Sequence, residues 1–149
     1  MKPGIASVIA LGVLVPHVGF AEETAPAPEA PAVAEIVLDE ALVKKGKKVF
    51  KKCKACHKVG AKAKNGVGPI MNGIYLRPAG TVEGYEYSPA LLTAAEGGLV
   101  WDDENLRAFL KKPKEFMPGT KMTFTGLKKE KDQTAVIEYL KSVSVPAAE

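Results

Sequence analysis

Apolar residues recur at helical spacing near both ends of the region between residues 39 and 145. Between Ala41 and about Lys52 they fall on one helical face, and Asp39 can cap this helix. Gly46 lies in its middle, where glycine costs roughly 1 kcal/mol relative to alanine, and so it predicts the close approach of another backbone. A last helix is predicted from about Lys129 to Ser142. Its apolar stripe is Val136, Tyr139, Leu140 and Val143.

The middle of the chain reads as loops joined by short helices. Residues 58–87 are rich in Gly, Asn and Pro and have no sustained period, which predicts a long loop. Pro89 can open a helix to about Glu96, and Asp102 can cap a third helix that ends at Pro113. No segment reads as a convincing strand. The pattern predicts an all-α domain with long loops, and such loops need something to pack against.

The N-terminal 38 residues predict a targeting segment and a linker. Lys2 gives a positive start, an apolar run of 11 residues follows from Ile5 to Val15, and small residues flank Phe20. Residues 1–21 therefore read as a secretory signal peptide cleaved after Ala21. The alternative is an uncleaved anchor, although the 16 residues available fall short of the ~20 that a spanning helix needs. Residues 22–38, rich in Ala, Pro and Glu, predict a flexible linker.

Composition and charge limit the classes of protein and of partner that fit this chain. A chain of 149 residues with 26% charged and 46% hydrophobic residues is typical of one globular domain. Residues 1–40 hold one lysine and six acids, while residues 41–149 hold the other 20 bases and 11 acids, net charges of −5 and +9. A basic domain attracts acidic proteins, nucleic acid or anionic lipid, or simply has a solvated lysine surface. Aromatic residues make up only 7%, so a cofactor could complete the core.

The sharpest signal is the run Cys53-Lys54-Ala55-Cys56-His57, because C-x-x-C-H is the attachment sequence of c-type haem. Two thiols three residues apart on one turn can each add to a haem vinyl group. His57 then reaches the iron from the same side. A structural zinc site would need four ligands, a thioredoxin-like pair expects a βαβ context, and a disulfide across two residues would stabilise little.

The second axial ligand stays open on the residues alone. The other histidine, His17, lies in the predicted signal peptide, so the candidates are Met71, Met117, Met122 or no protein ligand. Met122 follows a Pro-Gly turn in a loop between two helices, where an extended segment can lie against a flat cofactor. Met71 and Met117 are interpreted as core residues.

Several motifs, in order, resemble the class I c-type cytochromes, the family of mitochondrial cytochrome c and its bacterial periplasmic relatives. They are Gly46-x-x-x-Phe50-x-x-Cys53-x-x-Cys56-His57, Gly68-Pro69, the runs 73–80 and 84–88, Trp101, the run 116–124 with Gly126, and Tyr139-Leu140. The resemblance covers about residues 39–143. It implies a cytochrome c domain over residues 39–145, with about four to five helices and long loops around one haem c held by two thioethers, and a tail at 146–149.

The resemblance also implies roles for individual residues. His57 would be the proximal and Met122 the distal iron ligand, and the Pro69 carbonyl would accept a hydrogen bond from the other ring nitrogen of His57. Gly46 and Phe50 would pack against the last helix. The haem propionates would be stabilised by Tyr87, Trp101 and Arg77.

Two positions depart from the family pattern. Phe109 stands where the family commonly has a tyrosine that hydrogen-bonds near the methionine sulfur, so one hydroxyl group is missing there. Leu76 replaces a usual glycine before Arg77.

Together these features predict a function. An iron bound by both His and Met has no open site, which favours electron transfer over chemistry on a ligand. We predict a periplasmic, monomeric, non-enzymatic carrier of single electrons from a quinol-oxidising complex to a terminal oxidase, reductase or photosynthetic reaction centre. Nucleic acid is not an expected partner.

A ring of lysines would steer the predicted carrier to acidic docking surfaces of membrane redox complexes. The ring is Lys52, Lys114, Lys121, Lys128 and Lys129. The alternatives are a membrane-tethered cytochrome that keeps residues 1–21, and a haem enzyme or sensor with a labile distal ligand.

Overall fold

The computed structural model describes residues 36–144, so the predicted signal peptide, most of the linker and the tail lie outside the described residues. Within this range the elements are α1 (Glu40–Val49), the 3-10 helix η1 (Phe50–Lys52), α2 (Pro89–Glu96), α3 (Asp103–Lys111), α4 (Pro113–Phe116) and α5 (Glu130–Ser142). The β-pairing described there is one isolated bridge between Pro78 and Val100. The prediction of an all-α fold with long loops is confirmed. No helix between residues 36 and 144 is long and apolar enough to cross a bilayer.

Side-chain caps start three of the helices where the sequence predicts them. The Asp39 carboxylate accepts a hydrogen bond of 2.9 Å from the third amide along, and Asp102 does the same at 2.8 Å. Ser88 caps α2 in the same way at 3.2 Å, with Pro89 as the first helical residue. Each cap satisfies an amide that has no partner inside its helix.

The third helix is shorter than the sequence predicts. The prediction that it continues to Pro113 is wrong, because α3 ends at Lys111 and Pro113 begins the separate helix α4. Proline pushes the residue before it towards extended backbone, and Lys112 indeed has φ −154° and ψ 84°. Proline is favoured at the first position of a helix, where its missing N–H costs nothing.

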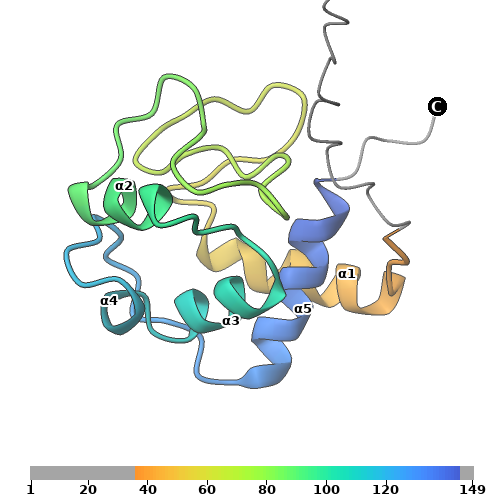
Figure 1. The fold of residues 1–149 in the computed structure, drawn as a ribbon. Coiled ribbons are helices and arrows are strands. Elements are labelled where there is room, and N and C mark those ends of the chain that lie inside the picture. The colour runs from red at the N-terminus through yellow and green to blue at the C-terminus, as the bar shows by residue number, and fades with distance from the viewer. Residues whose placement is uncertain (1–35, 145–149) are drawn as a thin grey trace, which may run out of the picture. The chain divides into compact units, whose positions relative to one another are not determined.

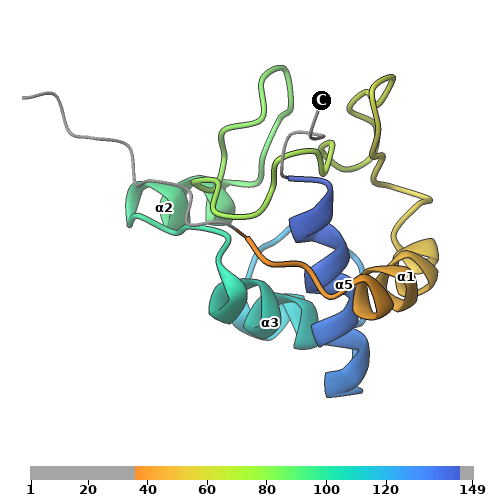
Figure 2. The ribbon, with the colours of Figure 1, turned by 90° about the vertical axis from the view of Figure 1, so that its right-hand side faces the viewer.

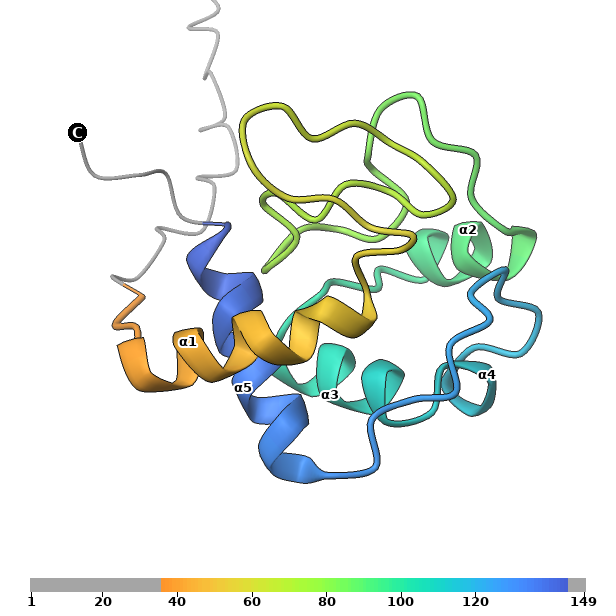
Figure 3. The same ribbon diagram turned by 180° about the vertical axis from the view of Figure 1, so that it is seen from behind.

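The first and last helices pack directly against each other. Figures 1 and 3 show α1 crossing α5. Gly46 makes the crossing possible, because a Cβ built there would lie 1.9 Å from the carbonyl oxygen of Ala135. Beside it, the rings of Phe50 and Tyr139 lie 5.2 Å apart between centroids. The predicted close approach at Gly46 and the packing of Phe50 on the last helix are confirmed.

The long loop between η1 and α2 lies on one side of α1, α3 and α5, and closes the domain over the helices (Figure 2). Its middle is held by backbone hydrogen bonds to distant segments. The amide of Gly73 donates to Val143, and Leu76 and Trp101 are joined by an amide-to-carbonyl bond of 3.0 Å. The loop therefore has a defined path, and one face of it lines an internal cavity.

Candidate functional site

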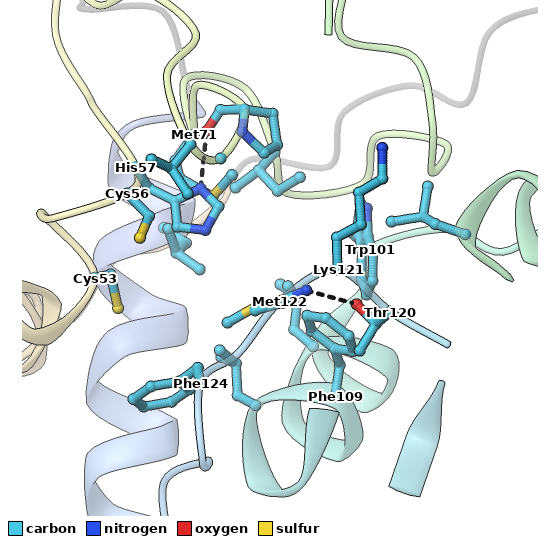
Figure 4. Close-up of a pocket in the computed structure, with 18 of the residues that line it drawn as sticks. Cys53, Cys56, His57, Met71, Trp101, Phe109, Thr120, Lys121, Met122 and Phe124 are labelled. Carbon is cyan, nitrogen blue, oxygen red and sulfur yellow. Dashed lines mark hydrogen bonds between the residues drawn. The ribbon is translucent and has the colours of Figure 1, made fainter. Parts of the chain in front are cut away.

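A cavity of about 380 Å³ lies between the long loop, α3, α5 and the segment that joins α4 to α5. This volume falls in the range of roughly 300–1,000 Å³ that is typical of small-molecule and cofactor sites. Figure 4 shows how the side chains converge on it. Of the residues predicted for the site, those that line the cavity are Cys53, Cys56, His57, Pro69, Tyr87, Trp101 and Met122.

Both cysteines face the cavity from the turn that follows η1. The amides of Cys56 and His57 donate to the carbonyl of Cys53 at 3.1 and 2.9 Å, and this tight turn places two thiols and an imidazole on one wall (Figure 4). The thiols are half-buried and are not joined in a disulfide. Burial raises the pKa of the Cys53 thiol, and the neighbouring Lys52 ammonium opposes part of that shift.

His57 is held in one orientation by the backbone of the next loop. Its Nδ1 lies 2.8 Å from the carbonyl oxygen of Pro69, and because a carbonyl can only accept, Nδ1 carries the proton. Burial lowers the pKa of His57, with the bond to Pro69 opposing the shift, so the ring is neutral near pH 7. Gly68 gives the ring its space, since a Cβ there would lie 2.4 Å from Cε1 of His57. The lone pair of Nε2 is therefore left free for a ligand.

Met122 faces the cavity from the wall opposite His57 (Figure 4). Its amide donates to Oγ1 of Thr120 at 3.3 Å, within the same loop. Met71 packs against the core, as predicted, and it also lines the cavity next to His57. Met117 is 4% exposed and belongs to the core, as predicted. Among the three methionines between residues 36 and 144, Met122 is thus the one that places its thioether across from the imidazole.

Aromatic side chains form another part of the wall. Trp101 is buried, and its ring lies 5.1 Å from that of Phe109, which in turn contacts Phe116 at 5.9 Å. Phe109 lines the cavity, so no hydroxyl group projects from this position. The Tyr87 hydroxyl accepts a hydrogen bond of 3.2 Å from the Val82 amide. Burial raises the pKa of Tyr87, and that hydrogen bond opposes part of the shift.

Arg77 is not brought into the cavity wall. Its guanidinium donates through Nη2 to the carbonyl of Asn72. The residue before it, Leu76, is the single non-glycine residue between 36 and 144 with a positive φ, at 60°. The backbone thus keeps a conformation that favours glycine, although the sequence has leucine there.

Tyr85 and Thr120 also line the wall, although the sequence predicts no role for either of them. Tyr85 lines the cavity and donates from its hydroxyl to the Val67 carbonyl at 2.8 Å. Thr120 lines it from the loop that carries Met122. Tyr85 and Tyr87 lie two positions apart and their rings contact edge to face at 4.8 Å. This spacing, which puts both side chains on one side of an extended segment, was the available signal for Tyr85.

These residues fit a flat, apolar, iron-bearing cofactor. Two thiols and a neutral imidazole share one wall, a thioether stands opposite, and aromatic groups lie between them. Imidazole and thioether are the axial ligands of haem iron in c-type proteins. Residues 36–144 contain no cluster of three or more His, Cys, Asp or Glu that could hold a separate metal ion. The fold and the site together define a haem protein of the c type.

Comparison with known proteins identifies the family. A family model described as cytochrome c matches residues 43–144, which is more than half of the chain, so the chain belongs to the cytochrome c family. Cytochrome c2 of Afifella marina is 50% identical over 101 residues, covering 68% of this chain and 82% of that protein. Cytochrome c-554 of Methylosinus trichosporium is 50% identical over 95 residues, covering 64% and 70%.

Solved structures show the same fold. The structure of cytochrome c2 from Rhodospirillum centenum has a TM-score of 0.66 and 41% identity, and the match covers 69% of this chain and 98% of that one. Cytochrome cH from Methylobacterium extorquens has a TM-score of 0.61 and 42% identity. The chain is thus a monohaem electron carrier with a covalently attached haem c, and its two cysteines fit the attachment motif of the family.

Proposed function

We propose that this protein carries single electrons in the periplasm, from a quinol-oxidising complex to a terminal oxidase, reductase or photosynthetic reaction centre, with His57 and Met122 as the axial ligands. The observation that carries the proposal is the placement of these two side chains on opposite walls of one cavity. Support for the compartment comes from the apolar N-terminal segment of the sequence.

The bound haem supplies a one-electron iron couple, and the protein supplies the setting for it. His57 offers the unprotonated Nε2, because the Pro69 carbonyl holds the proton on Nδ1. Met122 offers a thioether, which favours the reduced state. With His57 and Met122 both bound to the iron, no position would be left for a substrate, and we therefore propose that the protein is not an enzyme.

The cavity walls control charge and water. Tyr87 and Trp101 are proposed to hydrogen-bond the haem propionates from the walls they line, and Arg77 to offset their charge at longer range. The packed rings of Trp101, Phe109 and Phe116 are proposed to help exclude water from the cavity. A dry and apolar environment raises the potential of a haem.

Exposed lysines are proposed to dock the protein on acidic surfaces of membrane redox complexes. Lys52 and Lys121 reach the rim of the cavity itself. Lys52 also lies 3.9 Å from Asp132 in the first turn of α5, which brings the start of α5 to the same rim. The remaining exposed members of the ring are Lys114, Lys128 and Lys129. Charges in this position steer encounter and make it sensitive to salt.

The axial ligand is tested with the ferric haem-bearing protein. Met122→Leu is expected to abolish the weak charge-transfer band of methionine-ligated ferric haem, whereas the matched variant Met71→Leu, on the same wall as His57, keeps it. A band that survives in Met122→Leu, or is absent from the wild type at neutral pH, would overturn the assignment. Absence of the band together with ready binding of carbon monoxide by the reduced protein would favour a haem enzyme or sensor with a labile distal site.

The tethered alternative is tested by mass. We expect the intact mass of the protein from its native host to correspond to a chain that starts at Glu22 and bears one haem. A mass that includes residues 1–21 would instead support a membrane-tethered cytochrome.

A further inference from the structure

A buried amide group on α5 contacts the loop that carries Met122. Gln133 is 1% exposed and, with Ser88, is one of two buried polar side chains between residues 36 and 144. Its Nε2 donates a hydrogen bond of 2.6 Å to the carbonyl of Leu127. Because an unbonded amide in the core is costly, this hydrogen bond explains how the core accommodates a polar side chain on the inner face of α5.

Leu127 is fixed from two directions. Its amide donates to the carbonyl of Leu110 in α3 at 2.8 Å, while its own carbonyl accepts the bond from Gln133 in α5. The preceding residue, Gly126, has a φ of +99°, and a Cβ there would lie 2.1 Å from the carbonyl oxygen of Lys111. The end of the loop is therefore attached to α3 and α5 at once.

Met122 itself is held by weaker contacts. Its amide bonds to Thr120 at 3.3 Å, inside the same loop, and the Lys121 ammonium reaches the Glu86 carbonyl at 3.4 Å. At the start of the loop, the buried Met117 donates to the Pro113 carbonyl at 2.9 Å. The position of the thioether relative to His57 therefore depends chiefly on how the two ends of residues 118–127 are held.

We infer that Gln133 is a positioning residue for Met122, acting through Leu127. The inference rests on the proposed axial ligation by Met122. Without the Gln133 amide, the Leu127 carbonyl would be buried with no donor in the closed loop but solvated in an open one. Loss of the amide therefore shifts the loop towards conformations in which Met122 is withdrawn from the cavity.

The test compares the haem-bearing wild type with Gln133→Leu. Ile137→Val is the matched control, because Ile137 is also 1% exposed on α5 but is not part of the cavity wall. In the ferric protein, Gln133→Leu is expected to raise the equilibrium constant for loss of the methionine charge-transfer band at alkaline pH by about tenfold. Ile137→Val should not change this constant beyond its effect on global unfolding.

Amide hydrogen exchange gives a readout that does not depend on the ligand. Exchange across residues 118–127 should accelerate about tenfold in Gln133→Leu and not in Ile137→Val. The inference is overturned if Gln133→Leu changes neither the exchange rate nor the equilibrium constant for loss of the methionine band at alkaline pH. It is also overturned if both variants change these quantities equally once their stabilities are matched. If exchange accelerates but the wild type has no methionine band, positioning of the loop by Gln133 is supported and ligation by Met122 is overturned.

Discussion

At the scale of single residues, the orientation of His57 depends on backbone groups. The Pro69 carbonyl fixes one ring nitrogen, and the absent side chain of Gly68 leaves room for the ring. Neither group can rotate away as a side chain could, so the imidazole enters the cavity in a single direction. This arrangement lets a half-exposed loop provide a rigid ligand.

Gly68→Ala should therefore disturb the orientation of His57 although it removes no ligating or polar group. The added Cβ would lie 2.4 Å from Cε1 of His57, and such overpacking costs about 1–3 kcal/mol. We expect a lower ratio of haem to protein in the purified variant and a lower midpoint in guanidinium unfolding. Gly66→Ala is the control, since its Cβ would lie 3.7 Å from the Cys56 carbonyl oxygen, an ordinary van der Waals contact. Equal behaviour of the two variants would contradict the packing argument.

Residue spacing predicts much of this wall but not all of it. The turn from Cys53 to His57 is local, so the sequence alone places two thiols and an imidazole on one side. The approach of Met71 to the cavity depends on the path of a loop whose sequence has no periodicity. In addition, the residue type alone does not distinguish a methionine that lines a cavity from one that packs in the core. The buried hydrogen bond of Gln133 could likewise not be predicted from the sequence, because its partner is a backbone carbonyl, which every residue has.

At the scale of elements, the crossing of α1 and α5 is the central joint of the helices. Gly46→Ala is expected to destabilise the protein by about 3 kcal/mol, although alanine is the better helix former. The reason is that the new Cβ would meet the Ala135 carbonyl, a backbone group that cannot move aside, at 1.9 Å. Chemical unfolding of the haem-bearing protein measures the loss.

The control for this prediction is Lys45→Ala, next to Gly46 but exposed on α1. Its free energy of unfolding should stay within about 0.5 kcal/mol of the wild type. A Gly46→Ala variant as stable as Lys45→Ala would show that the two helices do not need close contact.

Helices with caps and apolar stripes were predictable, and breaks between helices were less so. Asp39, Asp102 and Pro89 mark helix starts through local hydrogen bonding and ring geometry. Pro113 is ambiguous in sequence, because proline can either follow a helix or begin one. The structure uses it to begin α4. The loop over residues 58–87 was predicted as a loop, but its path is set by distant partners such as Val143.

At the scale of the whole molecule, a charged cluster ties together segments that are far apart in sequence. The Tyr75 hydroxyl in the long loop donates to Asp103 at the start of α3, and Lys141 in α5 lies 2.9 Å from the same carboxylate. Glu138 joins the cluster at 3.7 Å from Lys141 and accepts the amide of Asp39 at 2.9 Å. The loop, α3, α5 and the start of α1 therefore meet at one place.

The cluster predicts a pH dependence of stability. Burial alone would raise the pKa of Asp103, but hydrogen bonds from Tyr75 and Lys141 outweigh it and the pKa lies below the usual value of 3.8. A depressed pKa stabilises the fold above the unfolded-state pKa, and this contribution is lost as the pH falls through the folded-state pKa. Because the side chain is 45% exposed, solvent screening limits the effect to about 1 kcal/mol.

Asp103→Asn should therefore be less stable than the wild type at pH 7, and the difference should narrow as the pH drops below about 4. Urea unfolding at a series of pH values measures it. The exposed neighbour Glu104 provides the control in Glu104→Gln. A stability difference for Asp103→Asn that stays constant from pH 7 to about pH 2 would rule out the charge as its cause.

The charge distribution around the rim predicts the response to salt. Lys129→Glu, at the start of α5, should slow oxidation of the reduced protein by ferricyanide several-fold at low ionic strength, with the difference vanishing at about 1 M salt. Lys44→Glu makes the same change of net charge on α1, roughly 12 Å along the helix from Lys52, and should have the smaller effect. Equal slowing by both variants would indicate that the net charge of the protein, and not the position of the charge at the rim of the cavity, controls the rate of oxidation.

The joint between α1 and α5 also sets the order of events during synthesis. Gly46 and Ala135 are in contact although almost the whole domain separates them in sequence, so a large loop must close to form this contact. A chain that emerges N-terminus first cannot complete this joint until α5 has followed. Until then, Cys53 and Cys56 belong to an open chain. The contact that joins the two ends of the domain thus leaves both thiols in an open chain, accessible for haem attachment, until α5 has been made and the chain has folded.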